Sequence, residues 1–165
     1  MTLALCSCRE PALEFAPSEQ RPALEEYKAP ASRVLEMDDA DAPQHFVRDI
    51  SSVSAANWRW TQQSPAVRIR VRSNENLKYV IDFTIADVTF KDTGPVTVAF
   101  TVNDRVLDRV RYDTPGSKHF EKAVPADWVE VNKDALAGAE IDRVWISKDD
   151  GARFGVILTR IGFRQ

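Results

Sequence analysis

Residues 66–72 read A-V-R-I-R-V-R, so apolar and basic side chains alternate strictly along this stretch. Successive side chains of a β-strand point to opposite faces of a sheet, whereas a helix would not separate valine from arginine so completely. Val67, Ile69 and Val71 can therefore face a core while the arginines between them face water. The pattern predicts a strand with one buried face.

Similar segments recur almost to the C-terminus, and clusters of turn-forming residues separate them. The pair Asn103-Asp104 lies between two alternating runs, which predicts a tight two-residue hairpin. The predicted strands cover residues 46–50, 58–61, 67–71, 79–90, 96–102, 105–112, 118–123, 143–147 and 153–163. This rhythm, without a sustained helical period, predicts an all-β domain: a two-sheet antiparallel β-sandwich of the jelly-roll type over residues 44–165.

Three local features modify the strand pattern. In residues 79–90 the apolar positions change phase after Ile85, which predicts a β-bulge near Ala86 and Asp87. Residues 125–128 and residues 133–138 are each expected to form a single helical turn.

Composition excludes several classes of protein. The chain has 165 residues, of which 44% are hydrophobic, and this is typical of one globular domain. The net charge of −3 predicts no general affinity for nucleic acid or for anionic membranes. No run of 18 apolar residues occurs, so a membrane-spanning helix is not expected.

The first eight residues, M-T-L-A-L-C-S-C, resemble the end of a bacterial lipoprotein signal. Leu5-Cys6-Ser7-Cys8 then matches a lipobox in which Cys8 is lipidated, and this predicts a start upstream of Met1 or a trimmed signal. Such a protein would be attached to a membrane only through its lipid anchor. It would lie in the bacterial cell envelope, periplasmic or surface-exposed. The alternative is that Cys6 and Cys8 are ordinary residues of a frayed terminus.

Residues 9–43 differ in kind from the rest of the chain. They contain five prolines, and residues 1–43 together carry nine acids against four bases. Proline at this spacing blocks long helices and the interior of a sheet, so we expect an extended acidic tether. The alternative is an arm that wraps the domain, with a few apolar anchors: Phe15, Tyr27, Val34 and Leu35.

The segments 96–112, the turn 114–116, and residues 119–125 with Trp128 look like parts of a galactose-binding-like jelly roll, as does the closing F-G-V-I-L-T-R-I-G-F of residues 154–163. The resemblance covers about residues 46–163 and is one of strand rhythm. It implies a mostly non-catalytic domain that often binds sugars, frequently with a structural calcium. The oxygens for calcium would come from residues 149–151, or from Asp92 with the region of Asp87. No other cofactor is expected.

Groups for acid–base catalysis are few. The sequence has only two histidines, His45 and His119, as candidate acid–base groups, and no common catalytic or nucleotide-binding motif occurs. The sequence therefore predicts a protein that is not an enzyme. A glycoside hydrolase with a carboxylate pair, such as Asp108 with Asp113 or Asp149 with Asp150, is the least favoured alternative.

Aromatic side chains are the candidates for sugar binding, because sugar C–H faces stack on indole and phenol rings. Trp58 and Trp60 share one face of a strand, which is a stacking platform if it faces outward and core if it faces inward. We expect at least one of them in the core, with Trp60 facing Val67 and Val71 across a sheet. Trp145 would face the side of its strand opposite to Val144 and Ile146, so one of these two sets must be less buried. Tyr112 would line a site or finish a hairpin.

Five arginines form what we call the arginine row. They could bind an acidic polysaccharide or a phosphate. The favoured interpretation is that they form cross-strand ion pairs on a solvated sheet face. The members of the row are Arg68, Arg70 and Arg72, joined by Arg109 and Arg111. The predicted ligand-binding residues are Trp58, Trp60, Arg68, Arg70, Tyr112 and Trp145, with a glycan or an envelope protein as partner. The alternative function is a protein-interaction module that docks a partner through a sheet edge or the acidic tether.

Overall fold

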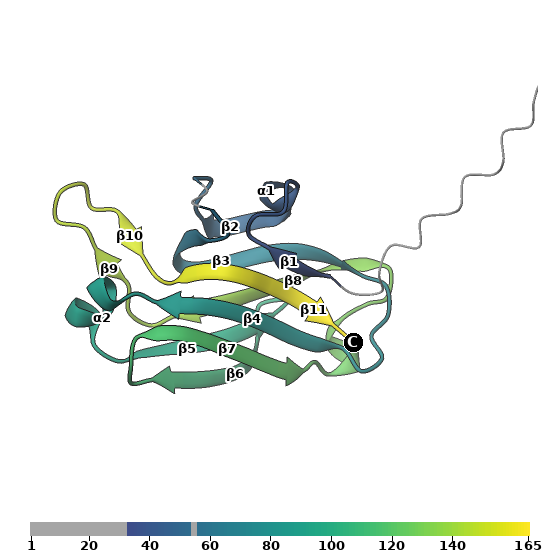
Figure 1. Ribbon diagram of the computed structural model, residues 1–165. Helices are drawn as coiled ribbons and strands as arrows, with labels where there is room; N and C mark the ends of the chain where they lie inside the picture. Colours follow the sequence, from purple (N-terminus) through teal and green to yellow (C-terminus); the bar gives the residue numbers. More distant parts are fainter. Residues whose placement is uncertain (1–32, 54–55) are drawn as a thin grey trace, which may run out of the picture.

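The computed structural model describes residues 33–53 and 56–165, which form two antiparallel sheets packed face to face (Figure 1). Sheet A consists of β1 (Val34–Glu36), β11 (Ile157–Arg164), β4 (Lys78–Ile85) and β7 (Gly116–Ala123). Sheet B consists of β2 (Phe46–Ile50), β3 (Arg59–Val71), β8 (Lys133–Ile141), β5 (Val96–Val102) and β6 (Arg105–Tyr112). The predicted jelly-roll β-sandwich is confirmed.

The long strand β3 belongs to both sheets. Its first residues, Arg59 and Trp60, pair with Leu158 and Ile157 of β11 in sheet A, and its residues 66–71 pair with β8 in sheet B. The predicted strands 58–61 and 67–71 are thus parts of one strand of 13 residues. Pro65 interrupts it without breaking it, because the register of β2 against β3 shifts there and a missing N–H is tolerated at such an irregularity.

Aromatic side chains from both sheets meet in the core. The Phe100 ring of β5 stacks on the Phe120 ring of β7 with 3.7 Å between centroids and 13° between planes. The same Phe100 ring lies 6.0 Å from Tyr79 and 6.2 Å from Phe83 on β4. These contacts join sheet B to sheet A, and the predicted inward-facing positions of β4 are all buried: Tyr79, Ile81, Phe83 and Ile85.

The prediction of a helical turn at residues 133–138 is wrong, because these residues begin the central strand β8, between β3 and β5. An alanine-rich segment favours a helix locally, but tertiary packing overrides that preference. Ala137 is fully buried, and a Cβ added to Gly138 would lie 2.9 Å from the Pro65 carbonyl oxygen. The Tyr79 hydroxyl also donates to the Gly138 carbonyl at 2.8 Å. Gly138 thus lets β3 lie close to β8 within sheet B, and its carbonyl bonds to Tyr79 of the opposite sheet.

The predicted bulge near Ala86 is also wrong. Strand β4 ends at Ile85 and the helix α2 (Asp87–Thr93) follows, so the change of apolar phase marks a change from strand to helix. The predicted strand 143–147 is reduced to β9 (Trp145–Ile146), and the predicted strand 153–163 is divided into β10 (Arg153–Phe154) and β11.

Two turn predictions are confirmed. Residues 125–128 contain the short 3₁₀ helix η1 (Ala126–Trp128). Asn103 and Asp104 form the turn between β5 and β6 with φ values of 50° and 62°. Two consecutive positive φ values are what a tight hairpin turn of this hand requires.

The N-terminal arm, which we define as residues 33–45, lies on the sandwich. Its strand β1 pairs with β11, and its side chains Leu35, Met37 and Ala42 are fully buried. A short helix, α1 (Ala42–His45), leads into β2. The domain boundary predicted at residue 44 is therefore wrong, since residues 33–43 are part of the packed structure, as the wrapping-arm alternative expects of Val34 and Leu35. Residues 1–32, with Cys8, Phe15 and Tyr27, lie outside the described residues.

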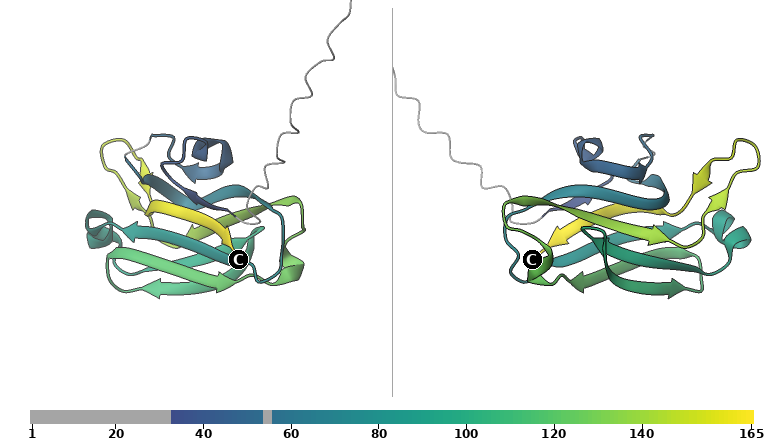
Figure 2. Two further views of the ribbon diagram at one scale, coloured as in Figure 1. Left: turned by 45° about the vertical axis from the view of Figure 1, so that its right-hand side comes forward. Right: turned by 180° about the vertical axis from the view of Figure 1, so that it is seen from behind.

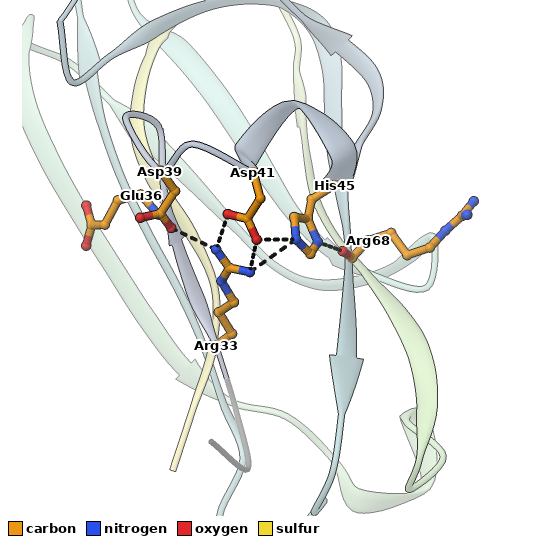
Figure 3. A network of polar contacts seen from close by, with 6 residues as sticks. All are labelled: Arg33, Glu36, Asp39, Asp41, His45 and Arg68. Carbon is orange, nitrogen blue, oxygen red and sulfur yellow. Dashed lines mark hydrogen bonds and ion pairs between the residues drawn. The ribbon is translucent and has the colours of Figure 1, made fainter. Parts of the chain in front are cut away.

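Polar contacts fasten the arm to β3 through a group that we call the Arg33 clasp: Arg33, Asp39, Asp41 and His45 (Figure 3). The Arg33 guanidinium donates to both carboxylate oxygens of Asp41, at 2.8 and 2.6 Å, and to Asp39 at 3.0 Å. The Nδ1 of His45 lies 2.9 Å from the backbone oxygen of Arg68, so Nδ1 carries the hydrogen. Its Nε2 then accepts from Arg33 Nη1 at 3.2 Å.

Replacing Tyr79 by Phe tests the hydrogen bond between the Tyr79 hydroxyl of sheet A and the Gly138 carbonyl of sheet B. We expect Tyr79→Phe to lower the free energy of unfolding by about 1–3 kcal/mol, because the substitution removes a donor to a buried carbonyl. Tyr112→Phe is the matched control, since Tyr112 is half-buried and its hydroxyl forms no hydrogen bond within the described residues. Urea denaturation measures both values, and equal losses would contradict this role for the Tyr79 hydroxyl.

The Arg33 clasp predicts a pH dependence. Hydrogen bonding from Arg33 holds the pKa of Asp41 well below its ordinary value of 3.8. Stabilisation by a carboxyl with a lowered pKa is present above the ordinary value and is lost as the pH falls below it. Between pH 6 and pH 3, Asp41→Asn should therefore lose less stability than the wild type, measured by thermal unfolding.

The control for this comparison is Asp127→Asn. Asp127 lies exposed in η1 and forms no ion pair within residues 33–53 and 56–165. Its variant should follow the wild-type pH curve. A parallel curve for Asp41→Asn would refute the contribution of the clasp.

Candidate functional site

Four aromatic rings form a continuous row at one end of the sandwich: Trp58, Trp60, Phe154 and Trp145. The ring centroids of Trp58 and Trp60 are 6.3 Å apart, and those of Trp60 and Phe154 are 5.1 Å apart, both edge to face. The row continues over 5.6 Å from Phe154 to Trp145. We call this set the aromatic row. All four side chains are half-buried, so the rings are neither core nor free surface.

Two elements supply the row, the beginning of β3 and the ribbon of β9 and β10. The ribbon projects from the end of the sandwich beside α2 (Figure 2). Phe154 and Trp145 are directly paired across the ribbon and so share one face. Gly155 fixes the ribbon against β3: its N–H donates to the Thr61 carbonyl at 2.8 Å, and a Cβ there would lie 2.2 Å from the Gln62 carbonyl oxygen. This close approach sets Phe154 beside Trp60.

A cavity of about 420 Å³, which we call the Trp60 pocket, lies beside this contact. Its lining consists of Ile50, Ser51, Ser52, Trp60, Thr61, Gln62, Ala152, Arg153 and Phe154. The side chains of Gln62 and Arg153 are exposed and form no hydrogen bond with the described residues. The pocket therefore combines two aromatic rings with an amide and a guanidinium that are free to bind a ligand.

Arg59, between the two tryptophans, points the other way along β3 and is only 5% exposed. Its Nε donates to the Met37 carbonyl at 3.2 Å, and its Nη1 donates to the carbonyls of Ser51 and Ser52 at 3.2 and 2.9 Å. The guanidinium also lies over the Phe46 ring at 5.1 Å. Arg59 thus holds two residues of the pocket lining by their backbone.

A second cavity, of about 660 Å³, lies between α2 and β9. Its lining consists of Lys91, Asp92, Thr93, Arg143, Val144, Trp145, Ile146 and Lys148. The indole N–H of Trp145 donates to Asp92 at 2.8 Å, and Arg143 donates to the Thr93 carbonyl at 3.3 Å. These bonds fix the orientation of the last ring of the aromatic row.

The structure brings together three of the six residues predicted for ligand binding: Trp58, Trp60 and Trp145. The expectation that Trp60 faces Val67 and Val71 across a sheet is wrong, because all three lie on β3 and the Trp60 ring contacts Phe154 instead. Trp145 is half-buried, its neighbour Ile146 is 51% exposed, and Phe154 connects Trp145 to the other tryptophans.

The other three predicted residues lie elsewhere. Tyr112, near the end of β6, packs edge to face on Phe83 at 5.5 Å. Arg68 and Arg70 lie on the outer face of sheet B, where Arg70 pairs with Asp134 at 3.5 Å. Arg111 likewise pairs with Asp113 at 2.8 Å. Of these two pairs, Arg70 with Asp134 is the cross-strand kind that the favoured interpretation of the arginine row expects, whereas Arg111 with Asp113 is local.

Sequence reasoning missed Phe154 and Arg59. Phe154 joins the row only through the register of β9 against β10, which no local pattern indicates. A signal for Arg59 was available, since an arginine between two tryptophans that belong to one face must point into the opposite side of the strand.

Several of the acidic residues proposed for catalysis or calcium have other partners. Asp108 accepts from Lys122 at 2.8 Å, which lowers the pKa of Asp108, and His119 bonds to Asp82. Asp150 accepts from the Ala152 amide at 3.0 Å. The described part of the chain contains no group of three or more His, Cys, Asp or Glu side chains placed to hold a metal ion. A calcium site stays a prediction.

Neither a protein-family model nor a curated protein matches this sequence. A similar solved structure is the native form of a family 35 carbohydrate binding module from Clostridium thermocellum. The two chains share 10% sequence identity with a TM-score of 0.44, and the match covers 81% of this chain and 98% of that chain.

None of the helices within residues 33–53 and 56–165 has the length and apolar character that a membrane span requires.

Proposed function

We propose that this chain is a non-catalytic glycan-binding β-sandwich and that the Trp60 pocket is its binding site. The observation that supports the proposal is the position of the Trp60 and Phe154 rings in the lining of a 420 Å³ cavity. Two half-buried rings in a cavity wall present apolar faces that the core does not cover.

The lining can contact both the apolar C–H face and the hydroxyl groups of a sugar. The C–H face of a pyranose stacks on an aromatic ring, and its hydroxyls exchange hydrogen bonds with amide and guanidinium groups. Gln62 offers one carbonyl oxygen and one NH₂ group, and Arg153 offers only donors. The volume lies within the range of about 300–1,000 Å³ that is usual for small-ligand pockets.

The same lining favours binding over catalysis. None of the residues that line the pocket in the described structure is Asp, Glu, His or Cys. General acid–base or nucleophilic hydrolysis of a glycosidic bond requires such a group beside the bond. A sugar in this pocket would be held without being cleaved.

Affinity electrophoresis tests the binding site. We expect gels containing galactomannan, xylan or pectin to identify a polysaccharide that retards the wild type, and we expect Trp60→Ala to weaken this binding by about tenfold, because loss of a stacking ring costs about 1.5 kcal/mol. Trp128→Ala is the matched control, since Trp128 lies in η1, near the other end of β3. Equal retardation of Trp60→Ala and the wild type would contradict the site.

We also propose that the protein acts in the bacterial cell envelope, attached through a lipid on Cys8. The proposal rests on the lipobox-like Leu5-Cys6-Ser7-Cys8, which precedes the described residues. A lipid on this cysteine would hold the domain at a membrane surface through the intervening tether.

Labelling in the source cells with an alkyne analogue of palmitate tests the anchor. The wild type and the control Cys6→Ser should both carry the label, whereas Cys8→Ser should lose it, because only the thiol of Cys8 is expected to accept the lipid. Label on Cys8→Ser equal to that on the wild type would exclude this anchor.

A further inference from the structure

Arg59 is the point at which the N-terminal arm meets the wall of the Trp60 pocket. Its guanidinium binds the carbonyl of Met37, which belongs to the arm, and the carbonyls of Ser51 and Ser52, which belong to the pocket lining. None of residues 33–45, which make up the arm, lines the pocket itself. Arg59 therefore links the arm to the pocket through a side chain, in addition to the backbone, which continues from the arm through β2 to Ile50 in the pocket lining.

Arg59 can stay buried only while its hydrogen-bond donors have partners in both segments. A guanidinium always carries its charge, and a buried charge is costly unless its donors are satisfied. Within the described residues Arg59 has no carboxylate partner, so three backbone carbonyls and the Phe46 ring provide its favourable environment. If the arm moved, Arg59 would lose the Met37 carbonyl, and the arrangement that holds Ser51 and Ser52 would change with it.

The arm itself has attachments that lie apart from the pocket. Its strand β1 pairs with β11 from Val34 to Glu36, and the Met37 amide donates to the Thr159 carbonyl at 2.9 Å. The Arg33 clasp fastens its two ends to each other and to β3 (Figure 3). A change made at Arg33 therefore alters how firmly the arm is held without touching the pocket lining.

We propose that Arg59 is a positioning residue that couples docking of the arm to the shape of the Trp60 pocket. Docking of the arm and binding of a ligand in the pocket then stabilise each other, since coupling between two sites is reciprocal. The second half of this statement rests on the proposed glycan-binding function, whereas the first half concerns the unliganded protein alone.

Hydrogen exchange in the unliganded protein tests the first half. The Ser51 amide, which donates to the Trp60 carbonyl at 2.9 Å, reports on the pocket wall. We expect Arg33→Gln to speed exchange of this amide by about fivefold or more, the lower end of typical coupling. In an Arg59→Met background, Arg33→Gln should add no further increase. An unchanged Ser51 amide in Arg33→Gln, or equal increases in both backgrounds, would overturn the coupling.

Exchange with mannohexaose or xylohexaose added tests the second half. In the wild type, whichever oligosaccharide binds should slow exchange of the Met37 amide, and in Arg59→Met the Met37 amide should be unaffected at equal pocket occupancy. Equal protection of Met37 in both proteins would overturn the reciprocal claim. If neither oligosaccharide, and none of the polysaccharides in the gels, binds the wild type, the proposed function fails, while the Ser51 result still decides the coupling.

Two further variants separate coupling from instability. Val71→Ala removes buried volume from the far end of β3 and should lower the melting temperature without changing exchange at Ser51. Arg59→Lys keeps the charge but presents one nitrogen to the carbonyls of two segments, so its exchange rates should lie between those of the wild type and Arg59→Met. If Arg59→Met does not fold, Arg59→Lys serves in its place, and full coupling in that protein would contradict the proposal.

Discussion

The sharing of β3 between two sheets is the constraint on which the rest of this structure depends. One end of the strand pairs with β11 in sheet A and the other end pairs with β8 in sheet B. The strand must therefore cross from one layer to the other, and the set of alternate side chains that faces the core changes between its two ends. Val67, Ile69 and Val71 enter the core between the sheets, whereas Trp58 and Trp60 reach the end of the sandwich, where the layers no longer cover them.

The two ends of β3 consequently have different chemistry. Around Phe100 stacked rings join the two sheets, and Gly138 lets neighbouring strands of sheet B lie close together, so this packing tolerates little change. Around Arg59 the interior contains a charged group that backbone carbonyls and one aromatic ring hold in place. Loops and exposed ribbons on a rigid scaffold are where binding residues are commonly found, and the aromatic row occupies such a place.

Sequence reasoning predicted the bounds of β2, β5 and β6 as observed, because turn-forming residues lie beside these strands. It failed for β8, because burial in the centre of sheet B overrides the local helix preference of Ala135 and Ala137. It identified three tryptophans of the site from their chemistry. It could not bring them together, since Phe154 connects them through pairing of two short strands, and it could not foresee that Leu35 and Met37 of the acidic segment would be buried.

The central claim is that the open end of the sandwich recognises a glycan through the rings at the beginning of β3. Nuclear magnetic resonance tests it most directly, because the chain has four tryptophans and each gives one indole N–H signal. On titration with the oligosaccharide that the protein binds, the account predicts that the signals of Trp60 and Trp58 shift together while that of Trp128, beneath Arg105, stays in place. A shift confined to Trp128, or binding that leaves Trp58 and Trp60 unmoved, would contradict it.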